Sequence, residues 1–506
     1  MNLKNDRAET WQSLQQHWDL IIIGGGITGA GVFRLAVAQG LRVLLIEKND
    51  FSSGTSSRSS KLIHGGFRYL RNRQFDITRE SVREREALLR EAPALVCPLG
   101  FILPYTASKK QRGEFRLGVT IYDLMAPKWK HHRLSRTGVQ NLVPQMSAPW
   151  LAGAYLYYDA VIDDSRMVLR LLSEGCRAGG TALNYARVET LLRNRDGTVC
   201  GVALGDQSPY ALGSLELQAR VVINATGPWS DTLRAQLSQP ARLRPQRGSH
   251  LIFPYERLPL PYAVTLLHPK DNRAMFAIPW EGTTLIGTTD LDHPAPLDLG
   301  EPYCTQTEVD YILEAAAAFF PSALLSQTDV LSSFAGLRPI IRGGVSDPSA
   351  ESRAHVVWEE NGLITITGGK LTIFRKMAED TMRKVAPRLG LNLKPHTRYF
   401  DALPRKNGTE FSEIIASQLL YLAGKYSFAL QDFLSSARPE ELAPVQGLPT
   451  IRAEIRYAAR CESVQHLDDL LLRRTRLGLQ LPEGGCAELP ALREVAREEL
   501  GWDDAR

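Results

Sequence analysis

Residues 59–70 read SSKLIHGGFRYL and place two adjacent glycines among histidine, lysine, arginine and tyrosine side chains. Glycines occur where the backbone bends sharply or approaches another group closely. Cations gathered around such a point indicate an anionic partner, because guanidinium and ammonium groups bind phosphate and carboxylate. Taken alone, the stretch is also typical of a surface turn. Its interpretation depends on the elements that position it.

A second glycine-rich stretch, with Gly24, Gly26 and Gly29, has the spacing GxGxxG. In a dinucleotide site the first glycine permits a tight turn, the second lets the backbone reach a pyrophosphate, and the third lets helix and strand pack closely. The pyrophosphate then lies at the positive end of the helix. Glu47 ends the next apolar run, where a carboxylate accepts both hydrogen bonds from an adenosine ribose. This carboxylate favours FAD or NAD over NADP.

These residues require a strand, a helix and a second strand, and residues 18–48 have that pattern. Residues 19–23 are a short apolar run, and residues 29–39 carry apolar side chains at helical spacing. Gly40 is placed to end the helix, and residues 42–47 form a second apolar run. The pattern predicts a βαβ unit, because a helix-length segment separates the two strands.

Two later segments favour FAD over NAD. NATGPW, at residues 224–229, reads as the end of a buried strand followed by a tight turn. Further along, Gly368 and Gly369 lie at another strand-to-helix junction, followed by Lys370. A helix N-terminus and a cation stabilise the negative charge that reduction places near N1 and the C2 oxygen of a flavin. A structural helix start with a solvated lysine explains that segment equally well on its own.

Composition limits the classes of function. The chain has 506 residues, 44% of them hydrophobic, and a formal net charge of +5. Its length suggests two to four domains or subdomains. The mild basic excess does not indicate nucleic acid as a partner, although it suits an anionic ligand or an anionic membrane surface.

The six cysteines have neither CxxC nor CxxxC spacing, which argues against a structural zinc site or an iron–sulfur cluster. We therefore predict no metal site. Sparse cysteines in a long chain also favour the reducing cytoplasm. The first eighteen residues lack the apolar core of a signal peptide, and the sequence has no uninterrupted apolar run of eighteen residues. Peripheral attachment to a membrane stays open.

Seven motifs together resemble one family. GGGITGAG, TSSRSSKLIHGGFRYL, NATGPW, RGSHLIFP, GTTD, GLRPI and TGGKLTIFRKMAED occur in the order found in FAD-dependent glycerol-3-phosphate dehydrogenases, which are flavoproteins related in fold to D-amino-acid oxidases. The resemblance runs from about residue 18 to about residue 478. The first seventeen residues and the ALPRKNG segment depart from the family's pattern.

The resemblance implies an α/β fold, with a Rossmann-like FAD-binding domain, an inserted mixed β-sheet substrate domain and a C-terminal α-helical domain. Residues 1–17 would be an N-terminal extension and residues 18–390 the oxidoreductase domain. Within it, the FAD-binding parts would be roughly 18–90, 155–245 and 335–390. Residues 394–408 read as a linker, and residues 408–506 would form the helical domain.

The resemblance also implies an activity. It is the oxidation of sn-glycerol 3-phosphate to dihydroxyacetone phosphate, with a hydride passing from C2 to N5 of FAD and electrons then passing to a membrane quinone. The enzyme would lie peripherally on the cytoplasmic side of the cell membrane, or in the cytoplasm, and a homodimer is left open. The basic, aromatic stretch PKWKHHRLSR, at residues 127–136, suits a membrane surface, although a solvated loop explains it equally well.

Roles for individual residues follow from the motifs. The substrate phosphate would be bound by Arg68, Tyr69 and, more weakly, Arg353, since guanidinium groups bind phosphate bidentately. His250 would be the base, because an unperturbed histidine titrates near pH 7. Arg338 would bind phosphate or polarise the developing oxyanion, and Lys370 would stabilise charge or serve as an alternative base.

A larger set of residues is predicted to contact the cofactor through glycine turns, hydroxyl groups and backbone N–H groups. The set is Gly24, Gly26, Gly29, Glu47, Ser57, Ser59, Ser60, Lys61, His64, Gly65, Gly66, Ala225, Thr226, Gly227, Gly368, Gly369, Lys370, Leu371 and Thr372. A flexible serine-rich loop is the other interpretation of residues 55–61.

Three other functions fit parts of the same pattern. One is an amine- or amino-acid-oxidising flavoenzyme of the same fold. Another is a dehydrogenase or oxidase for a different polyol phosphate, with oxygen or another acceptor in place of quinone. The last is a flavin-binding scaffold without catalysis. Reduction of the bound flavin by glycerol 3-phosphate, another polyol phosphate or glycine distinguishes them.

Overall fold

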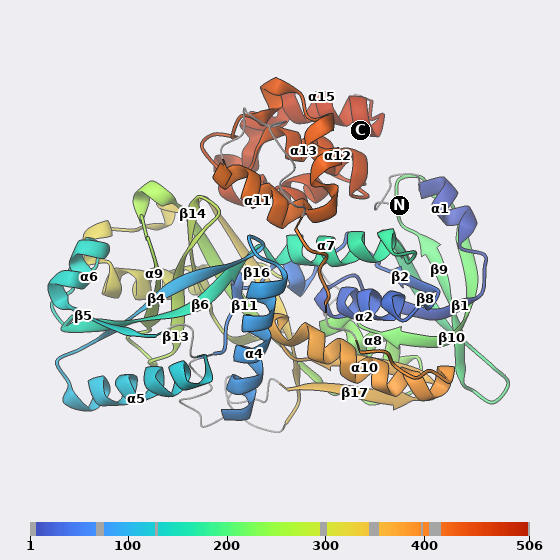
Figure 1. Ribbon diagram of the computed structural model, residues 1–506, viewed down its shortest axis with the longest axis horizontal. Coiled ribbons are helices and arrows are strands. Elements are labelled where there is room, and N and C mark those ends of the chain that lie inside the picture. Colours follow the sequence, from blue (N-terminus) through green and yellow to red (C-terminus); the bar gives the residue numbers. More distant parts are fainter. Residues whose placement is uncertain are drawn as a thin grey trace.

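The computed structural model describes residues 7–66, 75–126, 130–293, 301–343, 354–395, 398–403 and 416–503. Two β-sheets lie next to each other, and the helices of the C-terminal part of the chain, coloured orange to red, lie together above them in the view of Figure 1. The α/β fold predicted from the sequence, with an inserted mixed sheet and a C-terminal helical region, is confirmed.

The predicted βαβ unit is present as β1 (Trp18–Ile23), α2 (Ile27–Ala38) and β2 (Val43–Ile46). Both strands belong to a sheet that has eight strands within the described residues, in the order β17–β18–β10–β1–β2–β7, with β8 and β9 attached through β10. The pairs from β18 to β7 are parallel. The other strands are β7 (Thr181–Leu183), β8 (Ala186–Arg193), β9 (Val199–Asp206), β10 (Ser214–Asn224), β17 (His355–Glu360) and β18 (Leu363–Gly368).

The parallel part of this sheet is covered on both faces, as the continuous apolar sequence of its strands requires. Leu20 and Ile22 of β1 pack with α2, α7 (Asp164–Arg177) and α10 (Phe374–Leu389). Ile21, on the opposite face, packs with residues of β8, β9 and the N-terminal segment. The two faces therefore hold separate cores.

The first described residues of the chain, from Arg7 on, contribute to this second core. Helix α1 (Arg7–Ser13) buries Trp11 against the sheet. The Arg7 guanidinium donates from Nη1 to the carbonyl oxygen of Asn184 at 2.8 Å and from Nε to Asp206 at 3.0 Å. The N-terminal extension predicted at residues 1–17 is thus packed on the FAD-binding part wherever it is described.

The inserted sheet is mixed and has ten strands within the described residues. Its order is β15–β11–β14–β13–β12–β4–β6–β3, with β16 paired to β11 and β5 paired to β6. Only the pairing of β12 with β4 is parallel among these. The strands are β3 (Leu62–Ile63), β4 (Val96–Tyr105), β5 (His132–Ser135), β6 (Gly153–Ile162), β11 (Leu243–Pro254), β12 (Ala263–Leu267), β13 (Ala274–Trp280), β14 (Thr283–Gly287), β15 (Leu291–Asp292) and β16 (Ser332–Ile341).

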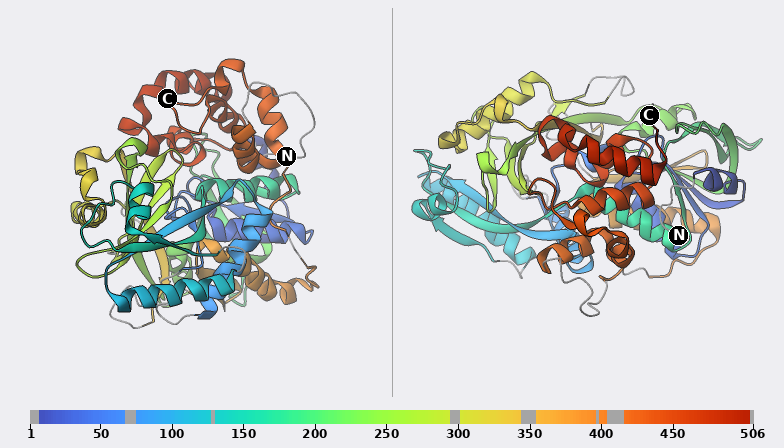
Figure 2. Two further views of the ribbon diagram at one scale, coloured as in Figure 1. Left: turned by 60° about the vertical axis from the view of Figure 1, so that its left-hand side comes forward. Right: turned by 90° about the horizontal axis from the view of Figure 1, so that it is seen from above.

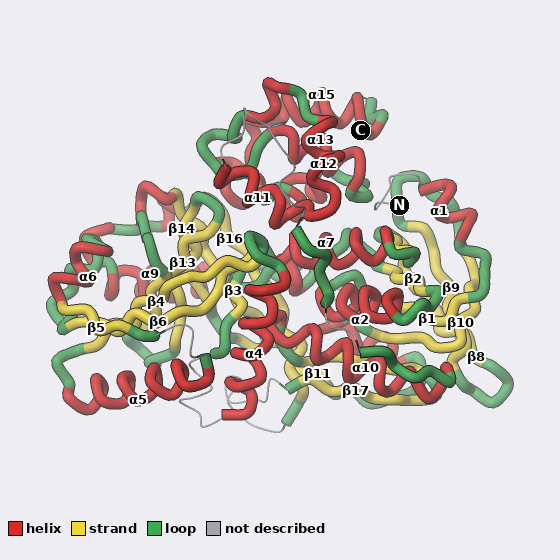
Figure 3. Tube along the Cα trace, in the orientation of Figure 1, coloured by secondary structure: helices red, strands yellow, loops and turns green. Residues whose placement is uncertain are grey.

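Four helices accompany the inserted sheet and pack against its strands. They are α4 (Phe75–Glu91), α5 (Lys109–Met125), α6 (Arg136–Leu142) and α9 (Gln306–Phe319). Figure 3, where helices are red and strands yellow, shows α5 and α6 at the outer end of this sheet.

The C-terminal region, from residue 416, is helical, as predicted. It lies across the molecule when seen from above (Figure 2). Its helices are α11 (Ala416–Tyr426), α12 (Leu430–Ser436), α13 (Arg452–Cys461), a π-helical turn (Asp469–Arg474), α14 (Leu477–Gln480) and α15 (Leu489–Leu500). In the predicted linker, Tyr399 and Phe400 are fully buried against the core shared by α2 and α10. This part of the linker is therefore packed rather than loose.

Among the described residues, no helix is both long enough and apolar enough to cross a membrane.

Candidate functional site

The GxGxxG loop is shaped by contacts that leave no room for side chains. Gly24 has φ +116°, and a Cβ there would lie 2.5 Å from the carbonyl oxygen of Ala225. A Cβ on Gly29 would lie 1.9 Å from the carbonyl oxygen of Gly24. The strand ends of β1 and β10 and the first turn of α2 are thus in direct backbone contact. Gly29 has the packing task that its spacing predicts.

The start of α2 lies open to a cavity of about 1310 Å³. Gly26, Ile27 and Thr28 line it, and the first turn of the helix carries no acidic side chain. Ser56 caps the turn, because its hydroxyl oxygen accepts a hydrogen bond from the Ile27 N–H at 2.8 Å. An anion is stabilised at such a helix N-terminus.

Glu47 lines the same cavity, one residue after the end of β2. Its carboxylate accepts hydrogen bonds from the N–H of Gly25 at 2.7 Å and the N–H of Asn49 at 2.9 Å. Burial raises the pKa of the Glu47 carboxyl, and these two backbone donors oppose that effect. The carboxylate is therefore fixed at the position predicted for a ribose.

The second predicted helix start is also present. Gly368 and Gly369, with φ +78° and +68°, turn the chain from β18 toward a 3-10 turn (Leu371–Ile373) and then α10. The first turn of α10 has no acidic residue. Lys370 donates from Nζ to the hydroxyl of Ser81, on α4, at 3.0 Å.

Most of the residues predicted to contact a cofactor come together around this single cavity. Those that line it are Gly24, Gly26, Glu47, Ser59, Ser60, His64, Gly66, Ala225, Thr226, Gly227, Gly368, Gly369, Lys370, Leu371 and Thr372. The predicted catalytic residues His250 and Arg338 line it too. Sequence positions from 24 to 372 thus meet at one site.

Four predicted contacts do not line the cavity: Gly29, Ser57, Lys61 and Gly65. The Lys61 side chain is fully buried, and its ammonium donates to both oxygens of Asp164 at 2.9 and 3.0 Å. Gly65 donates its N–H to the Tyr122 hydroxyl at 2.9 Å, and a Cβ there would lie 2.4 Å from that oxygen. The structure thus places Lys61 in an ion pair and Gly65 in a packing contact, behind the cavity wall.

His250, on β11, is 2% exposed. Its Nε2 lies 2.9 Å from the hydroxyl of Ser60, and its ring stacks on Phe334 with 4.7 Å between the ring centroids. Within the described residues, its Nδ1 is buried without a hydrogen-bond partner. Burial, with the charges of Arg338 and Lys61, holds the pKa of His250 well below its usual value. The imidazole is therefore neutral at pH 7.

Arg338, on β16, is fixed by three acceptors in the described part of the chain. Its Nη1 donates to Asp290 at 2.8 Å and to the carbonyl oxygen of Thr289 at 3.3 Å, and its Nη2 donates to the hydroxyl of Thr288 at 3.1 Å. Arg273 also pairs with Asp290, at 2.7 Å, and lines the cavity. One carboxylate thus binds two guanidinium groups at this wall of the cavity.

Arg273 and Asp290 were not singled out from the sequence. Asp290 belongs to the GTTD motif, so its place in that motif could have identified it as a candidate site residue. Arg273 stands in an ordinary turn, DNR, before an apolar run, and no signal separates it from the other basic residues. The predicted phosphate ligands Arg68, Tyr69 and Arg353 lie outside the described residues.

Several features of the cavity match what FAD requires of its site. Two helix N-termini without acidic side chains face it, as a pyrophosphate and a reduced flavin require. A fixed carboxylate lies at the end of β2 for the ribose. The cavity is also large enough for a dinucleotide, and its wall carries cations. The residues present fit FAD.

Comparison with known proteins agrees with this geometry. Residues 19–375 match the family described as FAD dependent oxidoreductase, and residues 364–506 match the C-terminal domain of alpha-glycerophosphate oxidase. A glycerol-3-phosphate dehydrogenase from Mycobacterium leprae is 35% identical over 98% of this chain and 87% of its own length. An aerobic glycerol-3-phosphate dehydrogenase from Staphylococcus aureus is 32% identical over 94% of this chain and 87% of its own length.

Among solved structures, the glycerol-3-phosphate dehydrogenase from Bacillus halodurans complexed with FAD is similar, with a TM-score of 0.77 and 29% identity. That similarity covers 99% of this chain and 95% of the other. The chain therefore belongs to the FAD dependent oxidoreductases, and within them to the glycerol-3-phosphate dehydrogenases.

Proposed function

We propose that this protein oxidises sn-glycerol 3-phosphate to dihydroxyacetone phosphate, with a hydride leaving C2 for N5 of FAD and electrons passing on to a membrane quinone. The observation that carries the proposal is the single cavity in which a fixed carboxylate, two helix N-termini, a neutral histidine and a cationic wall meet. The relatives' names support the same substrate.

FAD, when bound, supplies the hydride acceptor. His250 takes the proton of the C2 hydroxyl. A base must be unprotonated before the reaction, and the lowered pKa keeps this imidazole neutral. The Ser60 hydroxyl and the Phe334 ring restrict the ring to one orientation. The base is thereby held in a fixed orientation at the cavity wall.

Arg338 stabilises negative charge as the alcohol loses its proton. Its guanidinium is already oriented by Asp290 and Thr288, so no reorganisation is needed when charge develops. Its positive charge also favours binding of a dianionic phosphate, and Arg68, Tyr69 and Arg353 are proposed to complete that site. Lys370, held by Ser81, adds a cation at the helix start beside the flavin position.

An anaerobic titration tests the substrate. Purified protein with its bound FAD is mixed with sn-glycerol 3-phosphate, a tetritol phosphate or glycine, and the flavin absorbance is followed. We expect only glycerol 3-phosphate to bleach the flavin at low concentration. Bleaching by glycine would support an amine oxidase, and bleaching by no substrate would support the non-catalytic scaffold. Mixing the reduced protein with quinone or oxygen then identifies the acceptor.

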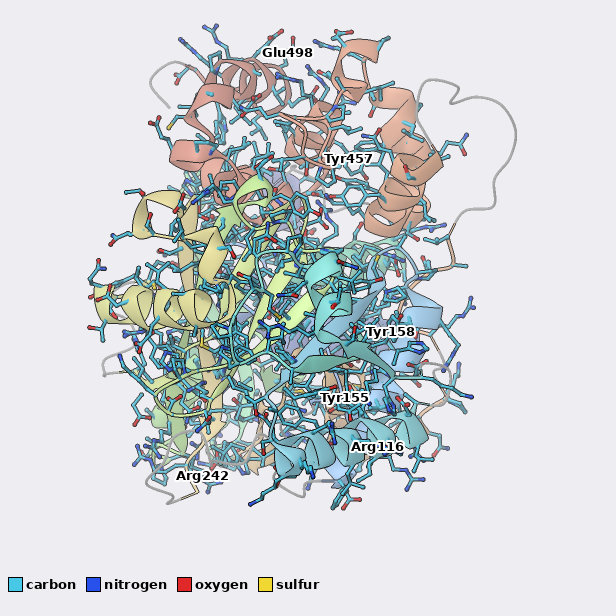
Figure 4. The ribbon with its side chains drawn as sticks, turned by 90° about the vertical axis from the view of Figure 1, so that its left-hand side faces the viewer. Arg116, Tyr155, Tyr158, Arg242, Tyr457 and Glu498 are labelled. Atoms are coloured by element: carbon cyan, nitrogen blue, oxygen red, sulfur yellow. The ribbon has the colours of Figure 1, made fainter. Side chains whose placement is uncertain are left out.

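The proposed peripheral contact with the cytoplasmic membrane face has a candidate surface on helix α5. Leu117 and Leu124 are 62% and 78% exposed there. They are seven residues apart and so lie on the same face of the helix. Arg112 and Arg116 are exposed on the same helix, and Arg116 lies at the end of the molecule opposite Glu498 (Figure 4). Exposed leucines flanked by arginines suit an anionic lipid surface.

Co-sedimentation with anionic vesicles measures this contact. Changing Leu117 and Leu124 to Glu removes apolar area and adds two negative charges, so we expect the bound fraction to fall severalfold. Leu324 is 80% exposed on the substrate domain and provides the matched control, Leu324→Glu, which should bind as the wild type does. Equal binding by both variants would contradict the placement.

A further inference from the structure

One residue of the C-terminal helical region bonds to groups that lie directly behind the wall of the proposed oxidation site. Arg476 lies in the turn between the π-helical turn and α14, and it is 1% exposed. Its guanidinium donates to Asp163 from Nε at 3.0 Å and from Nη2 at 2.8 Å. The same Nη2 donates to Asp164. A residue more than 300 positions away thus pairs with the two carboxylates that open α7.

Asp164 in turn holds the loop that precedes β3. Its Oδ2 accepts hydrogen bonds from the N–H of Ser59 at 3.1 Å and from the Ser59 hydroxyl at 2.6 Å. Both of its oxygens accept from the Lys61 ammonium. The residues on either side of Ser60 are therefore tied to one buried carboxylate, while the Ser60 hydroxyl lies against His250.

A second path leads from the same cluster to His250. The Lys61 ammonium lies 4.9 Å from the centroid of the Phe334 ring and 5.3 Å from that of Trp280. The Phe334 ring is the one on which His250 stacks. The position of Lys61 thus affects both the orientation and the electrostatic surroundings of the imidazole.

The four bonded members of the cluster carry two charges of each sign, and Arg166 and Lys425 add positive charge near Asp163. Asp163 and Asp164 face Lys61 and Arg476, all four being buried. Loss of one member leaves an uncompensated buried charge, so the remaining three must rearrange or change protonation. Because Ser59 and Lys61 are bonded to Asp164, such a rearrangement moves the Ser60 loop.

We propose that Arg476 is a positioning residue for the oxidation site, which it serves by fixing Asp164, and through Asp164 the Ser59–Lys61 loop that holds Ser60 against His250. The inference rests on the proposed role of His250 as the base. It assigns the C-terminal helical region a part in the chemistry, in addition to its own packing.

Arg476→Met is the test, with Arg456→Met as the matched control. Arg456 is 3% exposed and pairs with Glu441 at 2.7 Å and Glu499 at 2.8 Å within the helical region. A third partner, Glu498, lies at the outer end of that region (Figure 4). Both changes remove a buried guanidinium, but only Arg476 is connected to Ser60.

The flavin reduction rate at saturating glycerol 3-phosphate is measured against pH by anaerobic stopped flow. For Arg476→Met we expect retained FAD, a rate lowered by about tenfold or more, and little change in substrate affinity. Its acid limb should shift to higher pH, because the cluster has lost a cation. Arg456→Met should keep the wild-type rate and acid limb. Wild-type kinetics in Arg476→Met, or equal slowing in both variants, would overturn the inference.

Two further measurements cover the remaining outcomes. If Arg476→Met does not fold, Arg476→Lys and Ser59→Ala replace it, and unchanged kinetics in both would overturn the proposal. If the wild type is not reduced by glycerol 3-phosphate, the proposed function fails instead. In that case the positioning role is tested by NMR of the His250 ring in holoenzyme with ¹³C-labelled histidine. The His250 signal is assigned by its absence in His250→Asn. The pH midpoint of the His250 signal should shift in Arg476→Met. An unchanged midpoint in that variant would refute the positioning role of Arg476.

Discussion

Gly29→Ala is the sharpest test of the cofactor loop. The added Cβ would lie 1.9 Å from the carbonyl oxygen of Gly24, whereas real Cβ atoms essentially never approach closer than 3.0 Å. Helix and loop must therefore separate by about 1.1 Å, and neither contacting atom belongs to a flexible side chain. Overpacking of this kind costs about 1–3 kcal/mol, and we expect the upper part of that range because backbone must move.

Gly113→Ala is the control for Gly29→Ala. Gly113 also lies inside a helix, α5, but a Cβ there would meet nothing within 4 Å. Alanine is favoured over glycine in a helix interior by about 1 kcal/mol, so this variant should be slightly stabilised. In Gly29→Ala that gain is outweighed, and the displaced α2 N-terminus should bind the pyrophosphate of FAD less tightly.

The two variants are compared by denaturant unfolding and by the FAD released on ultrafiltration. Gly29→Ala should unfold at lower denaturant concentration than the wild type and release FAD more readily. Gly113→Ala should match or exceed the wild type in both measurements. If Gly29→Ala holds FAD as tightly as Gly113→Ala does, the close contact between α2 and the Gly24 turn is not needed for binding, and the reasoning fails.

Three other predictions concern the chemistry. His250→Ala should keep FAD but slow flavin reduction by about 10²–10⁴-fold, as expected for loss of a general base, and an unchanged rate in stopped flow would exclude that role. In the pH profile of the reduction rate, the acid limb should lie below pH 6.5, because burial and Arg338 lower the pKa of His250. Arg338→Met removes a nearby positive charge and should move this acid limb to higher pH. Arg68→Ala should raise the apparent Kd for glycerol 3-phosphate, and an unchanged Kd in the same titration would contradict the proposed phosphate contact.

The sequence predicted the parts of the site that depend on local pattern. The βαβ unit, the strand end and turn at NATGPW, and the Gly368–Gly369 helix start are each encoded within a short segment, by apolar runs and glycines. The position of Glu47 follows from the end of β2 in the same way. Such features need no knowledge of distant residues.

Features that depend on distant partners could not be predicted. Lys61 was expected at the cofactor because it stands in a serine-rich loop, but its partner Asp164 is 103 residues away in the sequence. Arg476 was not singled out from the sequence, since nothing near it in the sequence indicates Asp163. The packing of Trp11 on the FAD-binding part is likewise a tertiary contact.

We propose that the protein oxidises C2 of sn-glycerol 3-phosphate in this cavity. The most direct test of this proposal is a single anaerobic turnover with protiated and C2-deuterated substrate, in which flavin bleaching and dihydroxyacetone phosphate are both quantified. We expect one equivalent of dihydroxyacetone phosphate per flavin bleached and slower bleaching with the deuterated substrate. Bleaching without this product, or no bleaching at all, would contradict it.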